Sequence, residues 1–157
     1  MGQDDTKHNL LFISKYPQII HEFTDAMKDR DIEIETAING IEAAAKIKKK
    51  NYDIVITGLS LEGYNGEQII TYLNKTAPST VCIIYTTTIS SAQLHFFINE
   101  RNVFRVFLRP VDFRGAFWEA LEEAYEYHAV QVKNEEDTGA RRQEQEKQER
   151  EIEIMDQ

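Results

Sequence analysis

Apolar and polar residues follow two different periods along this chain. Segments of strand length occur five times: residues 9–14, 52–57, 81–85 and 103–108 are mainly apolar runs, and in residues 32–35 isoleucine alternates with glutamate. Each is followed by a segment whose apolar residues recur every three or four positions, as they do on one face of a helix. These segments predict helices over residues 17–27, 41–50, 67–75, 90–101 and 113–128.

Five strands that alternate with five helices predict one fold class. Consecutive strands separated by helices run parallel, and right-handed crossovers then place helices on both faces of the sheet. The sequence therefore predicts a doubly wound α/β domain with a five-stranded parallel sheet.

The composition changes after His128. Residues 134–139 are polar and turn-like, and residues 140–157 are mostly Arg, Gln, Glu and Lys with three late apolar residues, Ile152, Ile154 and Met155. We interpret the chain as a polar arm over residues 1–8, a domain over residues 9–128, a linker and a charged tail. Opposite charges three or four residues apart favour a solvated helix in the tail, but an isolated helix of this length is marginal, so disorder remains an alternative.

Composition narrows the cellular setting and the class of partner. The single cysteine, Cys82, lies inside an apolar run, which excludes an intramolecular disulfide and fits a reducing compartment. The apolar runs are too short to span a membrane, and the amino terminus is polar, so we expect a cytoplasmic protein that does not insert into membranes. A formal charge of −9 argues against nucleic-acid binding by this segment.

The segment over residues 53–66, DIVITGLSLEGYNG, is where we expect the functional site. It is a short apolar strand that ends at Gly58 and continues into a glycine-containing loop. Open α/β sheets place their chemistry in loops at the carboxyl ends of buried strands. Such a loop usually offers an acid, a nucleophile or a metal ligand, whereas this one offers Thr57, Gly58 and Ser60.

Over residues 9–128 the chain resembles the receiver domain of bacterial two-component response regulators. The stretch GLSLEGYNG, residues 58–66, matches in length and in both final glycines a family loop that reads like DLxMPGMDG. The resemblance implies a flavodoxin-like fold and a role in phosphorelay signal transduction. It also implies Mg²⁺-dependent phosphoryl transfer to an Asp after the third strand, with an acidic pair after the first strand, a Thr or Ser after the fourth and a Lys-Pro after the fifth.

This chain departs from that chemistry at most of the implied positions. Gly58 stands where the family has the phosphoacceptor Asp, and Ser14 and Lys15 stand where it has the acidic pair. Thr86 keeps the hydroxyl, and Arg109 before a proline replaces the Lys. Since aspartyl phosphorylation needs a carboxylate nucleophile and Mg²⁺ needs hard oxygen ligands, we expect a degenerate pseudo-receiver that is not an enzyme and holds no metal or cofactor.

If no phosphoryl transfer takes place in this pocket, we expect the function to lie in a surface that binds another protein. In a receiver-like fold the fourth helix, fifth strand and fifth helix form one face, where Val106 occupies the position of a switch aromatic. On the last helix, Trp118 and Tyr125 fall outside the stripe that we assign to the core. Large aromatics outside the core are favoured interface anchors. We therefore expect a homodimer or a protein partner on this face, and an output domain beyond the tail is a further candidate.

Two alternatives stay open. A phosphoryl group added to an unorthodox hydroxyl, such as Thr57, Ser60 or Thr86, would keep the family's reaction. Alternatively, Ser14, Lys15 and Arg109 would form a pocket that senses an anion or another small molecule. Asp53 and Glu62 are the nearest acids in sequence, but neither is expected at the end of the strand.

Overall fold

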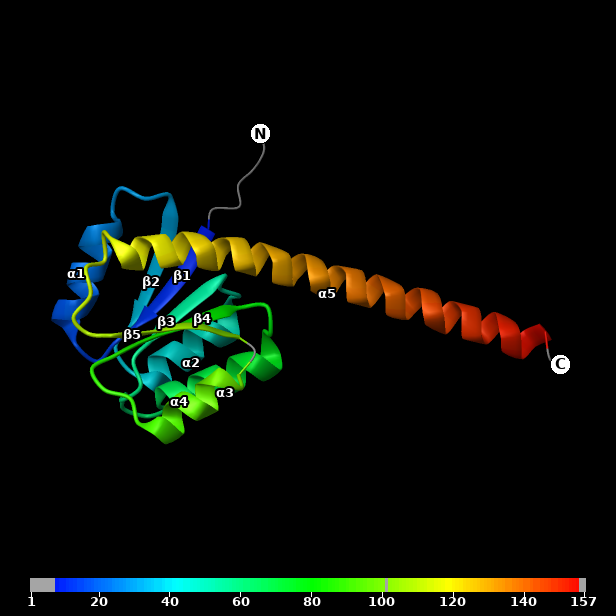
Figure 1. Ribbon diagram of the computed structural model, residues 1–157, viewed down its shortest axis with the longest axis horizontal. Helices are drawn as coiled ribbons and strands as arrows, with labels where there is room; N and C mark the ends of the chain where they lie inside the picture. The colour runs from blue at the N-terminus through cyan, green and yellow to red at the C-terminus, as the bar shows by residue number, and fades with distance from the viewer. Residues whose placement is uncertain (1–7, 101, 156–157) are drawn as a thin grey trace.

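The computed structural model describes residues 8–100 and 102–155, with side chains described as far as residue 136. It contains five strands and five helices in strict alternation (Figure 1), as the sequence predicts. The elements are β1 (His8–Ile13), α1 (Pro17–Met27), β2 (Ile32–Ala37), α2 (Gly40–Lys49), β3 (Ile54–Thr57), α3 (Gly66–Thr76), β4 (Val81–Thr86), α4 (Ser91–Ile98), β5 (Val103–Leu108) and α5 (Ala116–Met155). Apart from His8, the predicted arm lies outside the described residues, as does Arg101 at the end of the predicted fourth helix. No helix in the described part of the chain is long and apolar enough to cross a membrane.

The five strands form one parallel sheet in the order β2-β1-β3-β4-β5, so the predicted doubly wound fold is confirmed. β1 pairs with β2 on one side and with β3 on the other. The strand order therefore reverses at β1, and the connections leave the sheet in opposite directions there. In open α/β sheets this reversal opens a crevice at the carboxyl ends of the strands.

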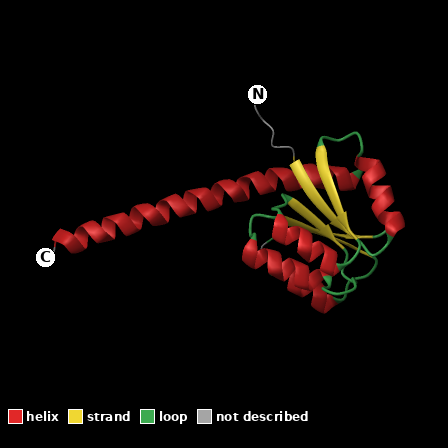
Figure 2. Ribbon diagram, turned by 180° about the vertical axis from the view of Figure 1, so that it is seen from behind, coloured by secondary structure: helices red, strands yellow, loops and turns green. Residues whose placement is uncertain are grey.

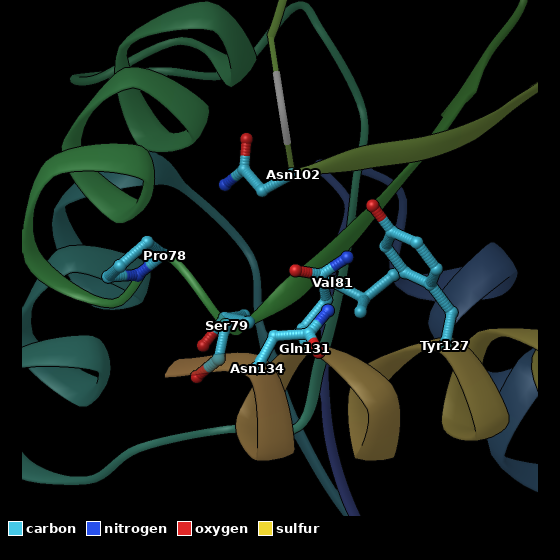
Figure 3. Close-up of a pocket in the computed structure, with 8 residues that line it drawn as sticks. Pro78, Ser79, Val81, Asn102, Tyr127, Gln131 and Asn134 are labelled. Carbon is cyan, nitrogen blue, oxygen red and sulfur yellow. The ribbon is translucent and has the colours of Figure 1, made fainter. Parts of the chain in front are cut away.

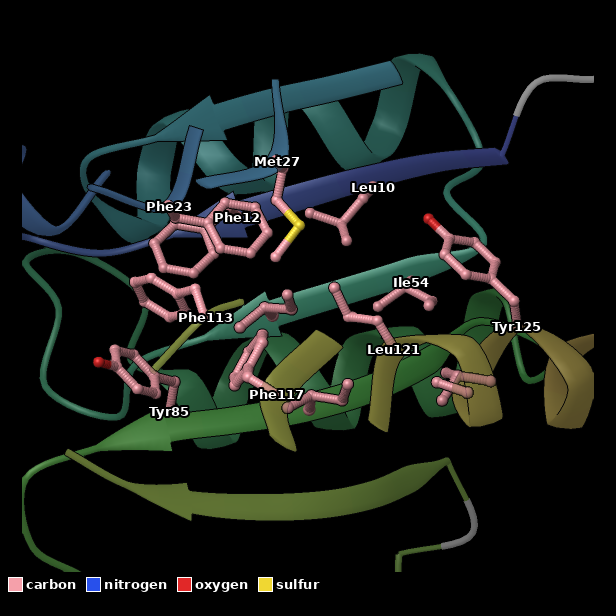
Figure 4. Packing of buried hydrophobic residues seen from close by; sticks show 14 residues of the cluster. Leu10, Phe12, Phe23, Met27, Ile54, Tyr85, Phe113, Phe117, Leu121 and Tyr125 are labelled. Carbon is pink, nitrogen blue, oxygen red and sulfur yellow. The ribbon is translucent and has the colours of Figure 1, made fainter. Parts of the chain in front are cut away.

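Two apolar layers hold the helices on the sheet. On one face α1 and α5 meet β1, β3 and β4 through a cluster of aromatic rings (Figure 4). Phe12 and Phe23 stack with their centroids 4.2 Å apart, and Phe113 meets Phe23 edge to face at 5.3 Å. On the other face α2, α3 and α4 pack against aliphatic residues such as Val55 and Ile84.

The loop after β3 is fixed by close backbone approaches. Gly63 has φ +80°, a conformation that favours glycine. A Cβ added to Gly66 would lie 2.3 Å from the carbonyl oxygen of Gly58, and the Gly66 amide donates to the Leu59 carbonyl at 2.9 Å. The two glycines that carry the sequence resemblance therefore shape the loop that positions Gly58.

The last helix differs from its predicted length. We expected it to span residues 113–128, but Phe113 to Gly115 form a turn and α5 runs unbroken from Ala116 to Met155, over 40 residues. The predicted end near His128 was wrong, and the predicted linker over residues 129–139 is helical. Extending a formed helix adds a hydrogen bond for each residue fixed, whereas starting one is costly, so a helix anchored on the core continues through polar residues. Figures 1 and 2 show α5 projecting well beyond the domain.

Candidate functional site

All five predicted pocket residues line one cavity of about 90 Å³ at the carboxyl edge of the sheet. We call this cavity the strand-end pocket. Its predicted members are Ser14, Lys15, Gly58, Thr86 and Arg109, and its other lining residues are Tyr16, Leu59, Ser60, Leu61, Tyr85 and Thr87. Because these segments follow four different strands, only the parallel sheet brings them together. The two tyrosines were missed, since nothing in their sequence context marks them.

Gly58 lies directly after β3, where the family resemblance places the phosphoacceptor. Its amide donates to the Ile13 carbonyl at 3.1 Å, and the hydroxyl of Thr57, fully buried, donates to the Gly58 carbonyl at 2.8 Å. A Cβ on Gly58 would meet its nearest neighbour, the Tyr85 carbonyl oxygen, at 3.6 Å, which is ordinary van der Waals contact. The backbone thus has room for a side chain at this position.

The positions of the acidic pair carry a hydroxyl and an ammonium group. Ser14 is 8% exposed, and its Oγ accepts a hydrogen bond from the Tyr16 amide at 3.2 Å. The Lys15 ammonium reaches across the pocket and donates to the Ser60 Oγ at 3.2 Å. A positive charge therefore lies where a divalent cation would need carboxylate oxygens.

Arg109 supplies a second cation from the far side. Its amide donates to the Thr86 carbonyl at 2.8 Å, and its peptide bond to Pro110 is cis. The guanidinium lies 4.8 Å from the ring centroid of Tyr16 and 5.8 Å from that of Tyr85. The Thr86 hydroxyl donates to the Thr88 carbonyl at 3.1 Å. The pocket thus presents two cations and several hydroxyls.

Among the residues that the structure describes, no carboxylate side chain lines the strand-end pocket. Glu62 is exposed and is absent from the lining, while Asp53 precedes β3 at the opposite edge of the sheet. The part of the chain that the structure describes holds no group of three His, Cys, Asp or Glu side chains placed to hold a metal ion. The expected positions of Glu62 and Asp53 are confirmed.

At the amino edge of the sheet, Asp53 belongs to a hydrogen-bonded network that the sequence did not predict. We call Asn9, Asp53, Ser79, Tyr125 and His128 the amino-edge network. The Asp53 carboxylate accepts from the Asn9 amide at 3.2 Å and lies 3.1 Å from Nε2 of His128. Nδ1 of His128 lies 2.8 Å from the Ser79 carbonyl oxygen. The network joins α5 to β1 and to the segments that precede β3 and β4.

The protonation of this pair follows from its contacts. Both ring nitrogens of His128 face oxygen atoms, and only the imidazolium donates from both. The hydrogen bond to Asp53 raises the pKa of His128, against burial, and the Ser79 carbonyl adds to the increase. Burial opposes ionisation of Asp53, but hydrogen bonds from His128 and the Asn9 backbone outweigh it, so the pKa of Asp53 is lowered. The pair is therefore an ion pair over the range between the two pKa values.

Tyr125 corrects the predicted partner face. It is 8% exposed and belongs to the core, and its hydroxyl donates to the Asn9 carbonyl at 3.0 Å. We had placed it outside the core stripe, yet it follows Leu121 by four residues and Phe117 by eight, which is the same helix face. Tyr125 is thus an anchor of α5 on the sheet and is withdrawn as an interface residue.

The other two predicted interface residues are half-buried. Trp118 packs beside the aromatic cluster, with the Arg30 guanidinium 4.1 Å from its ring centroid, so part of its surface is already covered. Val106 packs toward α2–α4, and Phe107 packs toward the opposite layer. More exposed apolar residues lie nearby on α4, where Ile98 is 72% exposed and Leu94 is also exposed. The apolar composition of α4, SAQLHFFI, was the missed signal.

A larger cavity, of about 420 Å³, lies beside the amino-edge network (Figure 3). Its lining residues are Pro78, Ser79, Thr80, Val81, Asn102, Tyr127, Gln131 and Asn134, all uncharged. Asn102 is 2% exposed, and its Nδ2 lies 3.3 Å from the Cys82 Sγ while its Oδ1 has no partner among the described residues. Cys82 is buried, and burial raises the pKa of its thiol. This cavity suits hydrogen bonding to uncharged groups.

Comparisons with known proteins agree with this architecture. A family model described as response regulator receiver domain matches residues 11–114. No curated protein matches the chain significantly. Among solved structures, the signal receiver domain of an HD domain-containing protein from Pseudomonas fluorescens Pf-5 is 19% identical with a TM-score of 0.75, over 80% of this chain and 99% of that one.

Two further structures show the same likeness in fold. A CheY-like response regulator receiver domain protein from Methanospirillum hungatei JF-1 is 18% identical with a TM-score of 0.72, over 80% of this chain and 99% of that one. A structure described as adenylate cyclase from Rhodopirellula baltica is 19% identical with a TM-score of 0.75, over 83% of this chain and 96% of that one. The five-stranded parallel fold is therefore one that receiver domains share.

Proposed function

The chain belongs to the response regulator receiver domain family, and from that premise we propose that it acts without phosphoryl transfer, as a module that binds a protein partner or a second copy. The observation that carries this proposal is the lining of the strand-end pocket. Gly58 has no nucleophile, and the pocket that surrounds it holds Lys15 and Arg109 but no carboxylate. The scaffold is that of a receiver, while the groups that react are replaced.

The chemical argument concerns the nucleophile and the metal ion. Phosphoryl transfer to a carboxylate needs that carboxylate in line with the phosphodonor, together with a divalent cation that neutralises the developing charge. Mg²⁺ prefers six oxygen ligands, usually including carboxylates. The Lys15 ammonium, bonded to the Ser60 hydroxyl at 3.2 Å, would repel such an ion. We therefore propose that the protein is not an enzyme and uses no metal or cofactor.

The proposed partner surface lies along the β5 edge of the sheet and includes α4 and the adjoining face of α5. Ile98 and Leu94 are exposed one helical turn apart on α4, and Leu108 is exposed at the end of β5. Val106 contributes a half-buried part of this surface, and Trp118, whose ring packs against Arg30 after α1, is kept as a separate proposed contact. Exposed apolar residues gathered on adjoining elements are typical of protein interfaces. A homodimer or a different protein fits this surface.

Phosphorylation is tested by incubating the intact protein with Mg²⁺ and a small phosphodonor and then measuring its mass. We expect no change for the natural sequence and none for Gly58→Asp alone, because the acidic pair would still be missing. The positive control is the triple variant Ser14→Asp, Lys15→Asp, Gly58→Asp, which rebuilds all three carboxylates. One phosphoryl group on the natural sequence would overturn the proposal and favour an unorthodox acceptor such as Thr57, Ser60 or Thr86.

The partner surface is tested by light scattering on the intact chain, with and without the phosphodonor. We expect a dimer in both conditions, and we expect Trp118→Ala and Ile98→Lys each to shift it toward monomer. Val130→Lys is the matched control, because Val130 is also an exposed apolar residue but lies further along α5. A monomer at micromolar concentration in every sample would exclude the homodimer and leave a different protein as the partner.

Anion sensing is a second candidate, favoured by the two cations of the strand-end pocket. A cavity of about 90 Å³ has the volume of roughly three water molecules, which suits a small oxyanion. Binding to the folded state raises the melting temperature as the anion concentration increases. We expect phosphate or sulfate to raise it in the natural protein and not in Lys15→Ala. Equal shifts in both proteins would show that the anion acts elsewhere.

A further inference from the structure

The outer face of α2 and α3 carries an apolar groove that the proposed function does not use. The groove has a volume of about 540 Å³. We call it the α2–α3 groove; it is lined by Ala44, Lys48, Tyr64, Glu67, Gln68, Ile69, Thr71, Tyr72, Lys75 and Phe96. Tyr64 is 45% exposed and Tyr72 is 36% exposed, so both rings are in contact with solvent.

These aromatic side chains are not needed to hold the helices on the sheet. α2 packs inward through Ala43 and Ile47, and α3 packs inward through Ile70 and Leu73. Neither phenolic hydroxyl of the groove makes a hydrogen bond to another described residue. Exposed tyrosines in an apolar groove are typical of surfaces that bind another polypeptide.

The charges at the edge of the groove indicate the chemistry of its occupant. Lys48 and Lys75 line it, and within the described part of the chain neither forms an ion pair. The acid of the groove, Glu67, already accepts a hydrogen bond from Nε2 of Gln93 at 3.3 Å. The two lysines outnumber this acid, so the charged side chains that line the groove carry a net charge of +1, although the whole chain has a formal charge of −9. An occupant with apolar side chains flanked by acids would complement this surface.

The chain itself contains a segment of that composition. Residues 149–157 read EREIEIMDQ, with four acids, one arginine and three large apolar residues. The backbone of α5 is helical as far as Met155, and Figures 1 and 2 show its carboxyl-terminal end standing clear of the domain. Because α5 is one unbroken helix, this end is held far from its own groove. It is accessible to a second copy of the chain.

We propose that residues 149–157 of one copy dock in the α2–α3 groove of a second copy. The contact seats Ile152 and Met155, which lie about one turn apart on one face of α5, in the tyrosine-lined groove and sets the flanking Glu151 and Glu153 against Lys48 and Lys75. Two copies of charge −9 repel at long range, but charges are largely screened beyond about 8 Å at physiological ionic strength. This inference does not rest on the strand-end pocket, so a phosphorylated chain would leave it intact.

Charge exchange between the two surfaces tests the contact. Sedimentation velocity on the full chain over a range of concentrations measures self-association. We expect the pair Lys48→Glu, Lys75→Glu to weaken it about tenfold or more, and the pair Glu151→Lys, Glu153→Lys to do the same. A chain that carries all four changes should regain most of the association, because opposite charges again face each other. Lys133→Glu is the control for a charge change outside the groove.

A disulfide test identifies the contact directly. The natural thiol, Cys82, is fully buried, so it does not react under these conditions. Any disulfide between two chains therefore forms between the cysteines introduced at the surface. Tyr72→Cys and Met155→Cys chains are mixed and oxidised, and we expect the mixed disulfide to form faster than the one between Ile98→Cys and Met155→Cys. Three results would each overturn the inference. The natural chain would not self-associate, the charge-reversing substitutions would leave self-association unchanged, or the disulfide would form faster at position 98 than at position 72. The last result would place the tail on the α4 surface instead.

Discussion

The carboxyl and amino edges of the sheet belong to the same strands but differ in how their charged side chains are paired. At the carboxyl edge, Lys15 and Arg109 face a cavity without a carboxylate, and their described contacts are a hydroxyl and aromatic rings. At the amino edge, Asp53 and His128 form a partly buried pair that backbone groups complete. The acid next to β3 therefore serves to hold α5 in place and has no access to the phosphorylation position.

This difference shows which edge constrains the sequence for stability. Paired buried charges become costly when one partner is removed, because the other remains desolvated and unpaired. In the strand-end pocket, Lys15 is exposed and Thr86 and Arg109 are only half-buried, so their charges and hydroxyl stay in contact with water. We therefore expect substitutions at the amino edge to lower the free energy of unfolding, and substitutions at the carboxyl edge to change it little.

The largest expected effect is that of Asp53→Ala. It leaves His128 without its carboxylate and the Asn9 amide without its acceptor, so we expect a loss of about 2–3 kcal/mol in the free energy of unfolding. Urea denaturation at pH 6 measures it. Asp112→Ala is a suitable control, because Asp112 is an exposed acid that accepts a hydrogen bond from a single neighbouring amide. Equal losses in the two variants would show that the network adds nothing.

The next effect is a dependence of stability on pH that the same pair creates. The pKa of His128 is raised in the folded protein, so its contribution is complete below the unfolded value of about 6.5 and is lost as the pH rises through the folded pKa. The pKa of Asp53 is lowered, so its contribution is complete above about 3.9 and is lost as the pH falls. We expect the melting temperature to decline above pH 6.5, and more weakly in His128→Gln. An unchanged slope in that variant would contradict the assignment.

A smaller effect is expected from Gly58→Asp at the carboxyl edge. The added Cβ has room, and the new carboxylate would lie in a pocket that contains Lys15 and Arg109. We expect the free energy of unfolding to increase by less than about 1 kcal/mol, because these cations attract the new carboxylate in the folded protein. Chemical denaturation at low and high salt measures the change. A loss of several kcal/mol would mean that glycine is required there for its backbone.

The smallest effect is expected from Thr86→Ala. The Thr86 hydroxyl is partly exposed and bonds the nearby Thr88 carbonyl, so its loss should cost less than about 0.5 kcal/mol. Thr80→Ala is the informative contrast, because the Thr80 hydroxyl is buried and donates to the Tyr52 carbonyl at 2.8 Å. Comparison of the two denaturation midpoints tests whether the difference between the edges extends to uncharged groups.

Much of the fold and of the pocket followed from local patterns in the sequence. Four strands are short, mainly apolar runs and β2 alternates apolar and polar residues, and the positions directly after parallel strands must meet at one edge of the sheet. The strand-end pocket could therefore be assembled from Ser14, Gly58, Thr86 and Arg109 before any contact was known. Tyr16 and Tyr85 were not predicted, because the sequence does not show whether the ring of a tyrosine near a strand end points into the pocket.

The amino-edge network could not be predicted in the same way. Asn9 and Asp53 are 44 residues apart, and Asp53 and His128 are further apart still, so no spacing rule connects them. The helical spacing did contain the position of Tyr125, and the error lay in ending the core stripe one residue too early. The end of α5 was misjudged because polar composition was interpreted as a linker, whereas a helix anchored on the core extends at little cost.

The length of α5 has a mechanical consequence. At 1.5 Å per residue its 40 residues extend about 60 Å, and only the first third is fixed to the sheet. A rigid rod of that length converts a small rotation at its base into a large displacement at its tip. Tilting the free part of α5, residues 129–155, by about 5° would move its far end by roughly 3.5 Å. Tyr125 and His128 lie near the fulcrum, so a change in their hydrogen bonds is amplified at the distal end of this lever.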